Sequence, residues 1–312
     1  MNKLLSNQSP YLLLILATMI WGGNFVIGRA IVGELPPFTL SFLRWILAAL
    51  IFIPFVWGEL VIQKEKLLKH WRPLLLMSLT GIAGFNTMLY AGLHYTTSIN
   101  ASLVNTTAPV LFAALAYFIL KEGINKNQVK GIILSLAGVL LIFSQGSLDI
   151  LLTFSFNIGD LIVFAAVILW TLYSIIIKHS AYKLPQLSSL AVTMVGGIFI
   201  LFPFFFWEIF ISGKEVVWSL GSVATIGYVG IFASVVAFLS WNNAVSKIGP
   251  GKAGIFLLLI PVFTTIFAII FIGESLKWYQ LVGGILAITG IYLSTRVGAQ
   301  NKINTTQKRS VT

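Results

Sequence analysis

Long apolar segments follow one another along the whole chain, and short polar stretches separate them. In runs such as residues 12–20 and 253–260, apolar and polar positions do not alternate as they would in the strands of a membrane barrel. A helix needs about 20 residues to cross the hydrocarbon core of a bilayer. The pattern therefore predicts an all-α integral membrane protein with ten transmembrane helices, at about residues 11–32, 38–57, 73–94, 101–120, 127–144, 158–178, 188–208, 220–245, 253–272 and 278–296.

Residues of the same kind recur in the two halves of the chain, at nearly constant separations along the sequence. The offset is 149 residues in the first spans and 152 in the later ones, and matched pairs are Trp21 and Trp170, Pro36 and Pro185, Pro109 and Pro261, Glu122 and Glu274, and Gly138 and Gly290. Each copy holds five predicted spans, an odd number, so the chain enters the two copies from opposite sides of the membrane. We expect two inverted five-helix repeats, residues 11–144 and 157–296, an arrangement typical of transporters. The polar residues 297–312 are expected to form a disordered tail.

Composition and charge support insertion into a membrane and predict its orientation. Apolar residues make up 58% of the chain and charged residues 9%, whereas soluble proteins have about 25% charged residues. Of the lysines and arginines other than Arg44, 16 fall on one predicted side of the membrane and 3 on the other. The positive-inside rule places the richer side, with both termini, in the cytoplasm. The net charge of +11 is then an orientation signal that also contacts anionic lipid, and nucleic acid is not expected as a partner.

Several motifs resemble those of a known family. They are the segment Ile20–Phe25, the pair Pro37 and Phe38, the segment Phe42–Ala49, and in each half a proline-centred span, a glutamate after it and a final Gly-x6-Gly span. In this order, and doubled, the chain resembles the ten-span bacterial EamA family of the drug/metabolite transporter superfamily over about residues 10–296. The resemblance implies two inverted repeats around a central cavity, and export or exchange of small organic solutes, often amino acids or related metabolites. The second half departs from the first, because Tyr173 stands where Asn24 does and no arginine matches Arg44.

Arg44 is the strongest candidate for a functional residue, because it lies well inside the second predicted span. A guanidinium there is costly unless it is paired or faces water. Arg44 either contacts an anion or a carboxylate in the outer part of the cavity, or it bonds backbone carbonyls and snorkels outward. The sequence leaves both possibilities open.

Other polar residues inside the spans are candidates for solute binding. They are Asn24, Asn86, Tyr90, Asn105, Trp241 and Asn242. Asn86 and Tyr90 are four residues apart, so they share one face of a helix. The two glycines before Asn24 weaken its helix and open the backbone. Because polar groups in lipid need partners, these side chains either line a cavity or bond to neighbouring helices.

Aromatic residues and prolines at matched positions add two hypotheses. Trp170, its counterpart Trp21, and Tyr173 either stack on a planar solute or belong to the packed core. Pro109 and Pro261 are expected in the middle of matched helices, where each removes a backbone hydrogen bond and bends the helix. The bends are either gating kinks or static shape.

Small residues in the last span of each repeat are expected to be structural. They form stripes that allow close helix packing, either against the bundle of a monomer or against a partner subunit in a homodimer, and they are Gly131, Ser135, Gly138, Gly283, Ala287 and Gly290. Glu122 and Glu274, each just past a proline-centred span, are expected to cap helices or to form salt bridges.

The distribution of chemistry favours a carrier over other functions. All nine acidic residues fall in loops or at span ends, so we expect facilitated diffusion, exchange, or coupling through the charge of the substrate rather than proton antiport. No nucleotide-binding loop, metal-ligand cluster or Ser/His/Asp set is visible, so neither a cofactor nor enzymatic activity is expected. The leading hypothesis is a secondary transporter of small organic metabolites such as amino acids in the cytoplasmic membrane. The alternatives are a multidrug or organic-cation efflux carrier and, less favoured, a channel.

Overall fold

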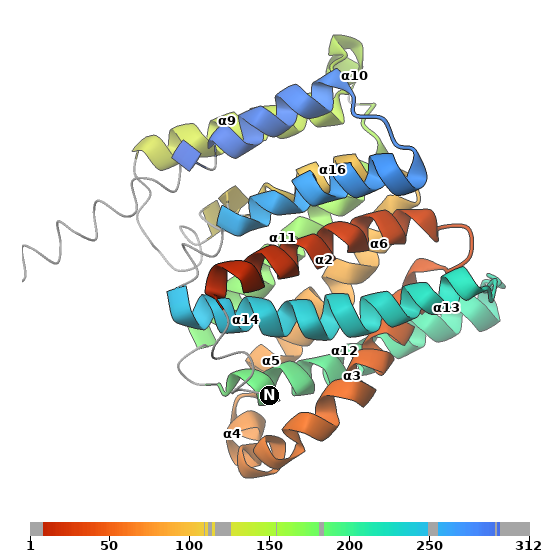
Figure 1. The fold of residues 1–312 in the computed structure, drawn as a ribbon, viewed down its shortest axis with the longest axis vertical. Coiled ribbons are helices and arrows are strands. Elements are labelled where there is room, and N and C mark those ends of the chain that lie inside the picture. Colours follow the sequence, from red (N-terminus) through yellow and green to blue (C-terminus); the bar gives the residue numbers. More distant parts are fainter. Residues whose placement is uncertain are drawn as a thin grey trace, which may run out of the picture.

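The computed structural model describes residues 9–108, 110–111, 114–115, 126–153, 155–180, 184–248, 255–290 and 292–293. All regular structure within these residues is helical. Among them, six helices are long and apolar enough to cross a membrane, and Val129–Phe143 and Phe256–Ile272 are shorter apolar helices. Most helices lie side by side with their axes running across the view of Figure 1, so the predicted membrane normal also runs across that view.

The described residues of the first half form a series of helices. In chain order they are α2 (Pro10–Ala30), α3 (Pro37–Ile62), α4 (Lys64–Lys69), α5 (Trp71–Met77), η1 (Ser78–Phe85), α6 (Asn86–Leu93), α7 (Ser98–Asn105) and α9 (Lys126–Phe143). Prolines begin α2 and α3, at positions where a helix has no partner for the missing N–H. The elements α5, η1 and α6 follow one another without a break, which makes one membrane-length helix.

The described residues of the second half also form a series of helices. It contains α10 (Leu148–Thr153), α11 (Ile158–Ser180), α12 (Gln186–Phe206), η2 (Trp207–Ile211), α13 (Leu220–Gly227), η3 (Tyr228–Val236), α14 (Ala237–Ile248), η4 (Ile255–Leu258), α16 (Leu259–Ile272) and the helical residues 278–290. The described residues of the predicted spans are helical, apart from a turn at Thr106 and Thr107 and short turns at span ends. Residues 109, 112–113 and 116–120 of the predicted fourth span lie outside the described residues, so the count of ten spans stays a prediction.

Two glutamates tie α3 and α12 together at both ends of the pair. Near the start of α3, the amide N–H and the hydroxyl of Thr39 donate to Oε2 of the buried Glu208, at 2.7 and 2.9 Å. Near the start of α12, the amide N–H of Ser188 donates to Oε1 of Glu59 at 3.4 Å, and the Ser188 hydroxyl donates to the same oxygen. Each carboxylate satisfies donors that a helix start leaves without a partner. Glu59 and Glu208 are 149 residues apart, so the two contacts follow the offset of the repeat.

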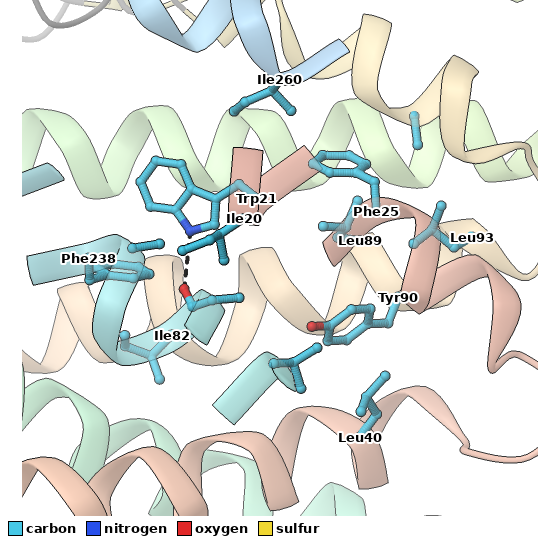
Figure 2. Packing of buried hydrophobic residues seen from close by; sticks show 14 of the residues in the cluster. Ile20, Trp21, Phe25, Leu40, Ile82, Leu89, Tyr90, Leu93, Phe238 and Ile260 are labelled. Carbon is cyan, nitrogen blue, oxygen red and sulfur yellow. Dashed lines mark hydrogen bonds between the residues drawn. The ribbon is translucent and has the colours of Figure 1, made fainter. Parts of the chain in front are cut away.

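Two π-helical segments, η1 and η3, interrupt the α-helical hydrogen bonding at matched places in the two halves. A π segment shifts the bonding and frees backbone carbonyls for other donors, and such segments are frequent at functional sites. The indole N–H of Trp45 donates to the carbonyl of Ile82 in η1 at 3.1 Å. The indole N–H of Trp21 donates to the carbonyl of Ala233 in η3 at 3.1 Å, the bond drawn as a dashed line in Figure 2. These bonds fix both tryptophans at the centre of the bundle.

The small-residue stripes pack against each other. A Cβ atom added to Gly138 of α9 would lie 2.4 Å from the carbonyl oxygen of Gly283, and one added to Gly290 would lie 2.5 Å from that of Gly131. Such distances leave no room for a side chain, so the expected close helix packing is confirmed. The two helices lie together at one edge of the molecule, at the top of Figure 1.

The carboxylate of Glu274 caps α7. It accepts hydrogen bonds from the amide N–H groups of Ser98 at 2.8 Å and Ile99 at 3.1 Å. Capping, one of its two expected roles, is therefore confirmed. Its counterpart Glu122 lies outside the described residues.

Candidate functional site

Arg44 is held at the centre of the bundle by three side chains. It is only 1% exposed. Its Nε–H donates to the hydroxyl of Ser234 at 2.5 Å, and Nη1 donates to Oδ1 of Asn86 at 2.8 Å and to the hydroxyl of Tyr90 at 2.6 Å. The guanidinium also lies over the ring of Trp45, 5.1 Å from its centroid. Helices α3 and α6 and the π segment η3 thus converge on one charge.

The Tyr90 hydroxyl extends this network to a fourth element. It donates to Oδ1 of Asn24 in α2 at 2.8 Å. Asn86 is positioned by η1, because its amide donates to the Gly81 carbonyl at 3.0 Å. Figure 2 shows the Tyr90 hydroxyl directed toward the middle of the cluster, opposite Trp21. The predicted shared face of Asn86 and Tyr90 is therefore confirmed, and both residues bind Arg44.

A small cavity of about 40 Å³ lies beside this network. Its lining residues come from both halves of the chain, and they are Trp21, Asn24, Phe25, Arg44, Phe85, Asn86, Leu89, Asn105, Ala108, Trp170, Phe238, Leu257 and Ile260. Apart from the indole N–H of Trp170, its polar lining groups come from the first half, at Asn24, Arg44, Asn86 and Asn105. The cavity is therefore amphipathic, with the charged and amide groups supplied by one half of the chain and an apolar surface supplied by both.

Aromatic rings form the apolar side of the cavity. The ring centroids of Trp21 and Trp170 are 6.5 Å apart in an edge-to-face arrangement, and those of Phe85 and Trp170 are 4.9 Å apart. Phe238 meets Trp21 edge to face at 5.7 Å between ring centroids, and Figure 2 shows the two rings side by side. Edge-to-face contacts of this kind are favourable arrangements for aromatic rings. The apolar side is thus a fixed aromatic surface.

Matched positions of the two halves line the same cavity. Four pairs of lining residues are separated by the offsets of the repeat, namely Trp21 and Trp170, Asn86 and Phe238, Asn105 and Leu257, and Ala108 and Ile260. Two of these pairs set an amide of the first half against an apolar side chain of the second. The difference in sequence between the halves therefore produces the polar and apolar sides.

Arg44 has hydrogen-bonding capacity that the protein does not use. Its partners are neutral, and its Nη2 has no hydrogen-bond partner among the described residues. None of the described carboxylates forms an ion pair with it, although a guanidinium removed from water is stabilised by a balancing charge. Because Arg44 lines the cavity, it offers donors to an anionic group that enters.

The candidate residues predicted from the sequence divide into three groups. Asn24, Arg44, Asn86, Asn105 and Trp170 line the cavity, and Tyr90 supports them by binding Arg44. Tyr173 and Trp241 pack behind the lining, Tyr173 against Trp170 at 5.2 Å between ring centroids and Trp241 against Trp21 at 5.6 Å. The Asn242 side chain and Pro109 lie outside what the structure describes.

Pro261 lies inside a helical stretch, where the 3-10 turn η4 passes directly into α16. It occupies the third position of α16, beside the cavity residues Leu257 and Ile260. The bend expected at Pro261 stays a prediction.

Some residues of the site are not among the candidates that the sequence predicts, and Ser234, Phe85 and Phe238 are examples. Ser234 binds Arg44, and Phe85 and Phe238 line the cavity. Phe238 could have been found, because it lies 152 residues after Asn86. Nothing in the local sequence marks Ser234 or Phe85, since a serine and a phenylalanine in an apolar segment are ordinary.

A second hollow of about 370 Å³ lies on the predicted outer side. Its lining includes Arg29, Thr97 and Glu274. Both charged groups already have structural partners, because Arg29 donates to the Leu93 carbonyl at 2.7 Å and Glu274 caps α7. The central cavity is therefore the better candidate for recognition of a solute.

Comparison with known proteins identifies the class to which this architecture belongs. The model of the EamA-like transporter family matches residues 8–144 and again residues 157–296. The chain belongs to the EamA-like transporter family. It is thus a multi-pass membrane transporter and not an enzyme.

Relatives of this EamA protein match it over nearly their whole length. The uncharacterized transporter YyaM of Bacillus subtilis is 30% identical over 302 residues, which are 96% of this chain and 98% of that protein. An uncharacterized transporter of Archaeoglobus fulgidus is 31% identical over 290 residues, 93% of this chain and 98% of that one. A Salmonella typhimurium protein named "Probable amino-acid metabolite efflux pump" is 23% identical over 292 residues, 90% of this chain and 93% of that one.

The arrangement of helices in this EamA protein also has a counterpart among solved structures. One crystal structure has a TM-score of 0.64 to this chain at 19% identity, and the match covers 94% of this chain and 98% of that one. At this identity the likeness concerns the fold alone. The path of the chain through both halves is therefore one that a solved protein also follows.

Proposed function

We propose that this EamA protein is a secondary transporter that exports or exchanges small organic carboxylates with an apolar part, such as amino acids, across the cytoplasmic membrane. In this proposal the solute binds in the central cavity, with its carboxylate at Arg44 and its apolar part against Trp21 and Trp170. The observation that carries the proposal is a buried guanidinium beside an aromatic surface, with no hydrogen-bond partner for its Nη2 among the described residues. The name of the Salmonella typhimurium relative points in the same direction.

Alternating access between two inverted five-helix repeats is part of the proposal. The family model matches the chain twice, and Glu59 and Glu208 make the same helix-start contact at opposite ends of the α3 and α12 pair. The charge distribution supports cytoplasmic termini. Repeats of this kind give one site two equivalent routes, one to each side of the membrane.

The size of the cavity supports a conformational step during binding. Its volume of about 40 Å³ is far smaller than the roughly 300–1,000 Å³ of cavities that hold small-molecule ligands. An amino acid fits only if the lining helices separate. Alternating access includes such a step, so the cavity corresponds to a closed arrangement of the carrier.

Coupling by exchange is the proposed source of energy. The lining contains one cation and no carboxylate among the described residues. Intramembrane carboxylates are the usual proton carriers of antiporters. An anionic group that enters at Arg44 balances the charge of the guanidinium. The conformational change between the two sides then costs less free energy with solute bound than without it, which favours exchange.

Counterflow in proteoliposomes tests the proposal. Vesicles that contain the reconstituted protein are loaded with one amino acid and assayed for uptake of labelled amino acids, nucleosides and organic cations. We expect amino-acid uptake that falls about 10- to 100-fold in Arg44→Ala, since hydrogen bonds to a charged group are lost. Arg72→Ala is the matched control, because Arg72 is exposed and its ring contact is with the exposed Trp71. Amino-acid uptake that is equal in wild type and Arg44→Ala contradicts the proposal.

An organic-cation carrier is the second candidate function. The observation in its favour is the aromatic surface, because cations bind the faces of aromatic rings. The charge of Arg44 opposes it, since a cation in the same small cavity is repelled. Uptake of organic cations that is unaffected by Arg44→Ala would favour this function and reduce Arg44 to a structural role.

A further inference from the structure

Asn105 has an unused hydrogen-bond acceptor at the cavity. The residue ends α7 and lines the cavity. Its side-chain oxygen Oδ1 is buried and has no hydrogen-bond partner among the described residues. Most buried polar atoms in proteins have partners. An unpaired acceptor beside a solute cavity points to a donor on the solute.

The backbone around Asn105 adds to this acceptor capacity. The hydroxyls of Thr106 and Thr107 donate to the carbonyls of Leu103 and Val104, and their amide N–H groups bond to the same two carbonyls, so the α-helical pattern ends at Asn105. Four residues later the chain has a proline, which has no N–H to give to the Asn105 carbonyl. The last carbonyls of a helix carry partial negative charge. The end of α7 is therefore a favourable place for a positive group.

Asn105 and Arg44 form a complementary pair across one cavity. Arg44 has donors to spare, and Asn105 has an acceptor to spare. An α-amino acid carries the matching groups, a carboxylate that accepts and an ammonium that donates. At the matched position of the second half stands Leu257, which has no polar side-chain atom, so the amino acid has only one favourable orientation.

We propose that Asn105 recognises the protonated amino group of the solute and sets a preference for amino acids over the corresponding 2-oxo acids. The inference rests on the proposed binding of a carboxylate at Arg44. A 2-oxo acid has the same carboxylate and side chain but no N–H. Its bound form leaves Asn105 Oδ1 unpaired, and sites built to bond a polar group reject analogues that lack it.

The test compares two solute pairs that differ only at the α position. Proteoliposomes are assayed for counterflow of L-leucine against 4-methyl-2-oxopentanoate, and of L-phenylalanine against phenylpyruvate. We expect the wild type to prefer the amino acid of each pair about 10- to 100-fold, the effect of one hydrogen bond to a charged group. In Asn105→Leu, which gives the site the side chain of its counterpart Leu257, we expect amino-acid uptake to fall by that factor and 2-oxo acid uptake to stay within about twofold.

Asn105→Asp is the second variant and keeps the size of the side chain. Its carboxylate is a stronger acceptor, so amino-acid uptake is expected to persist while uptake of the 2-oxo acids falls further, because two carboxylates repel. This variant decides the question if Asn105→Leu is recovered as an aggregate.

The outcomes separate the inference from the proposed function. Amino-acid uptake that depends on Arg44, but falls equally for both members of a solute pair in Asn105→Leu, overturns the role of Asn105 alone. Equal use of amino and 2-oxo acids by the wild type does the same. Absence of uptake of all four solutes by the wild type overturns the proposed function together with the inference.

Discussion

The hydroxyl group of Tyr90 connects Arg44 and Asn24, two polar residues that are not repeated in the second half of the chain. Tyr90 accepts a hydrogen bond from Arg44 and donates one to Asn24. The counterparts of Arg44 and Asn24 in the second half are Thr193 and Tyr173, so this chain of bonds exists only once among the described residues. The bond from Arg44 to Tyr90, with those to Asn86 and Ser234, holds the guanidinium in place.

At the scale of this residue, we predict the effect of Tyr90→Phe. The variant keeps the ring but removes one acceptor from Arg44 and one donor from Asn24. A lost hydrogen bond is equivalent to about 1 kcal/mol, so the half-saturating concentration of an amino-acid substrate should rise about fivefold. The maximal exchange rate should change little, because Arg44 keeps Asn86 and Ser234 as partners.

Concentration-dependent counterflow measures both quantities. Tyr95→Phe is the matched control, because Tyr95 is 60% exposed and lies outside the cavity lining. An unchanged half-saturating concentration in Tyr90→Phe, or an equal rise in Tyr95→Phe, would show that the hydroxyl does not position Arg44.

The single-residue candidates show which part of the site a sequence can reveal. Arg44 and Asn24 could be predicted because charge and amide groups are costly inside a membrane and therefore need a reason. Ser234 could not, because a serine is common in membrane helices and its role comes from a neighbour 190 residues away in the sequence. For Tyr173 the sequence leaves two roles open, stacking on a planar solute or packing in the core. Its burial between Trp170 and Gly81 favours packing in the core.

At the scale of helices, the contacts of Glu59 and Glu208 predict that loss of either glutamate lowers the stability of the folded protein. Replacing Glu208 with alanine leaves the buried amide and hydroxyl of Thr39 without their acceptor. Loss of such a helix-start interaction costs about 0.5–2 kcal/mol. We expect Glu208→Ala and Glu59→Ala each to lower the midpoint of thermal unfolding in detergent, and the double variant to lower it further.

Glu65→Ala is the control for these variants, because Glu65 lies exposed in the short helix α4. Unfolding is followed by the loss of monodisperse protein on heating. A midpoint for Glu208→Ala equal to that of Glu65→Ala would mean that the helix-start contact contributes nothing to the packing of α3 on α12.

Helix irregularities were the least predictable feature at this scale. The hydrophobic pattern indicates where η1 and η3 run, but a π segment changes only the bonding partner of each amide and leaves hydropathy unaffected. Pro54 and Pro203 lie inside α3 and α12 at an offset of 149 residues, so the repeat could have drawn attention to them. The glycine stripes could be predicted because close helix packing needs small residues.

At the scale of the whole molecule, the sequence repeat and the differences between its two copies both affect the cavity. Equivalent positions such as Asn105 and Leu257 line one cavity, and they lie in the two segments that the family model matches. Their difference in polarity gives the cavity a polar and an apolar side. A symmetric cavity would bind a solute equally well in two orientations, whereas this one defines a single orientation for a solute with one charged end.

The orientation of the molecule in the membrane is predicted from charge alone. The chain has no cysteine, so a single introduced thiol is the only one present. Leu148 in α10 and Leu68 in α4 are 75% and 61% exposed, and the charge bias predicts that they lie outside and inside the cell, respectively. A membrane-impermeant maleimide should therefore label Leu148→Cys in intact cells and Leu68→Cys only after the cells are permeabilised.

The control for this labelling experiment is the wild type, which has no thiol and gives the background, while a permeant maleimide shows that both introduced thiols react. Labelling of Leu68→Cys in intact cells, with protection of Leu148→Cys, would reverse the predicted orientation. Equal labelling of both variants in intact cells would contradict the three spans predicted between α4 and α10, because an odd number of crossings puts the two helices on opposite sides. Opposite accessibility of the two thiols is therefore the result that the inverted arrangement of the two halves requires, since the second half can begin on the outer side only if the first half crosses the membrane an odd number of times.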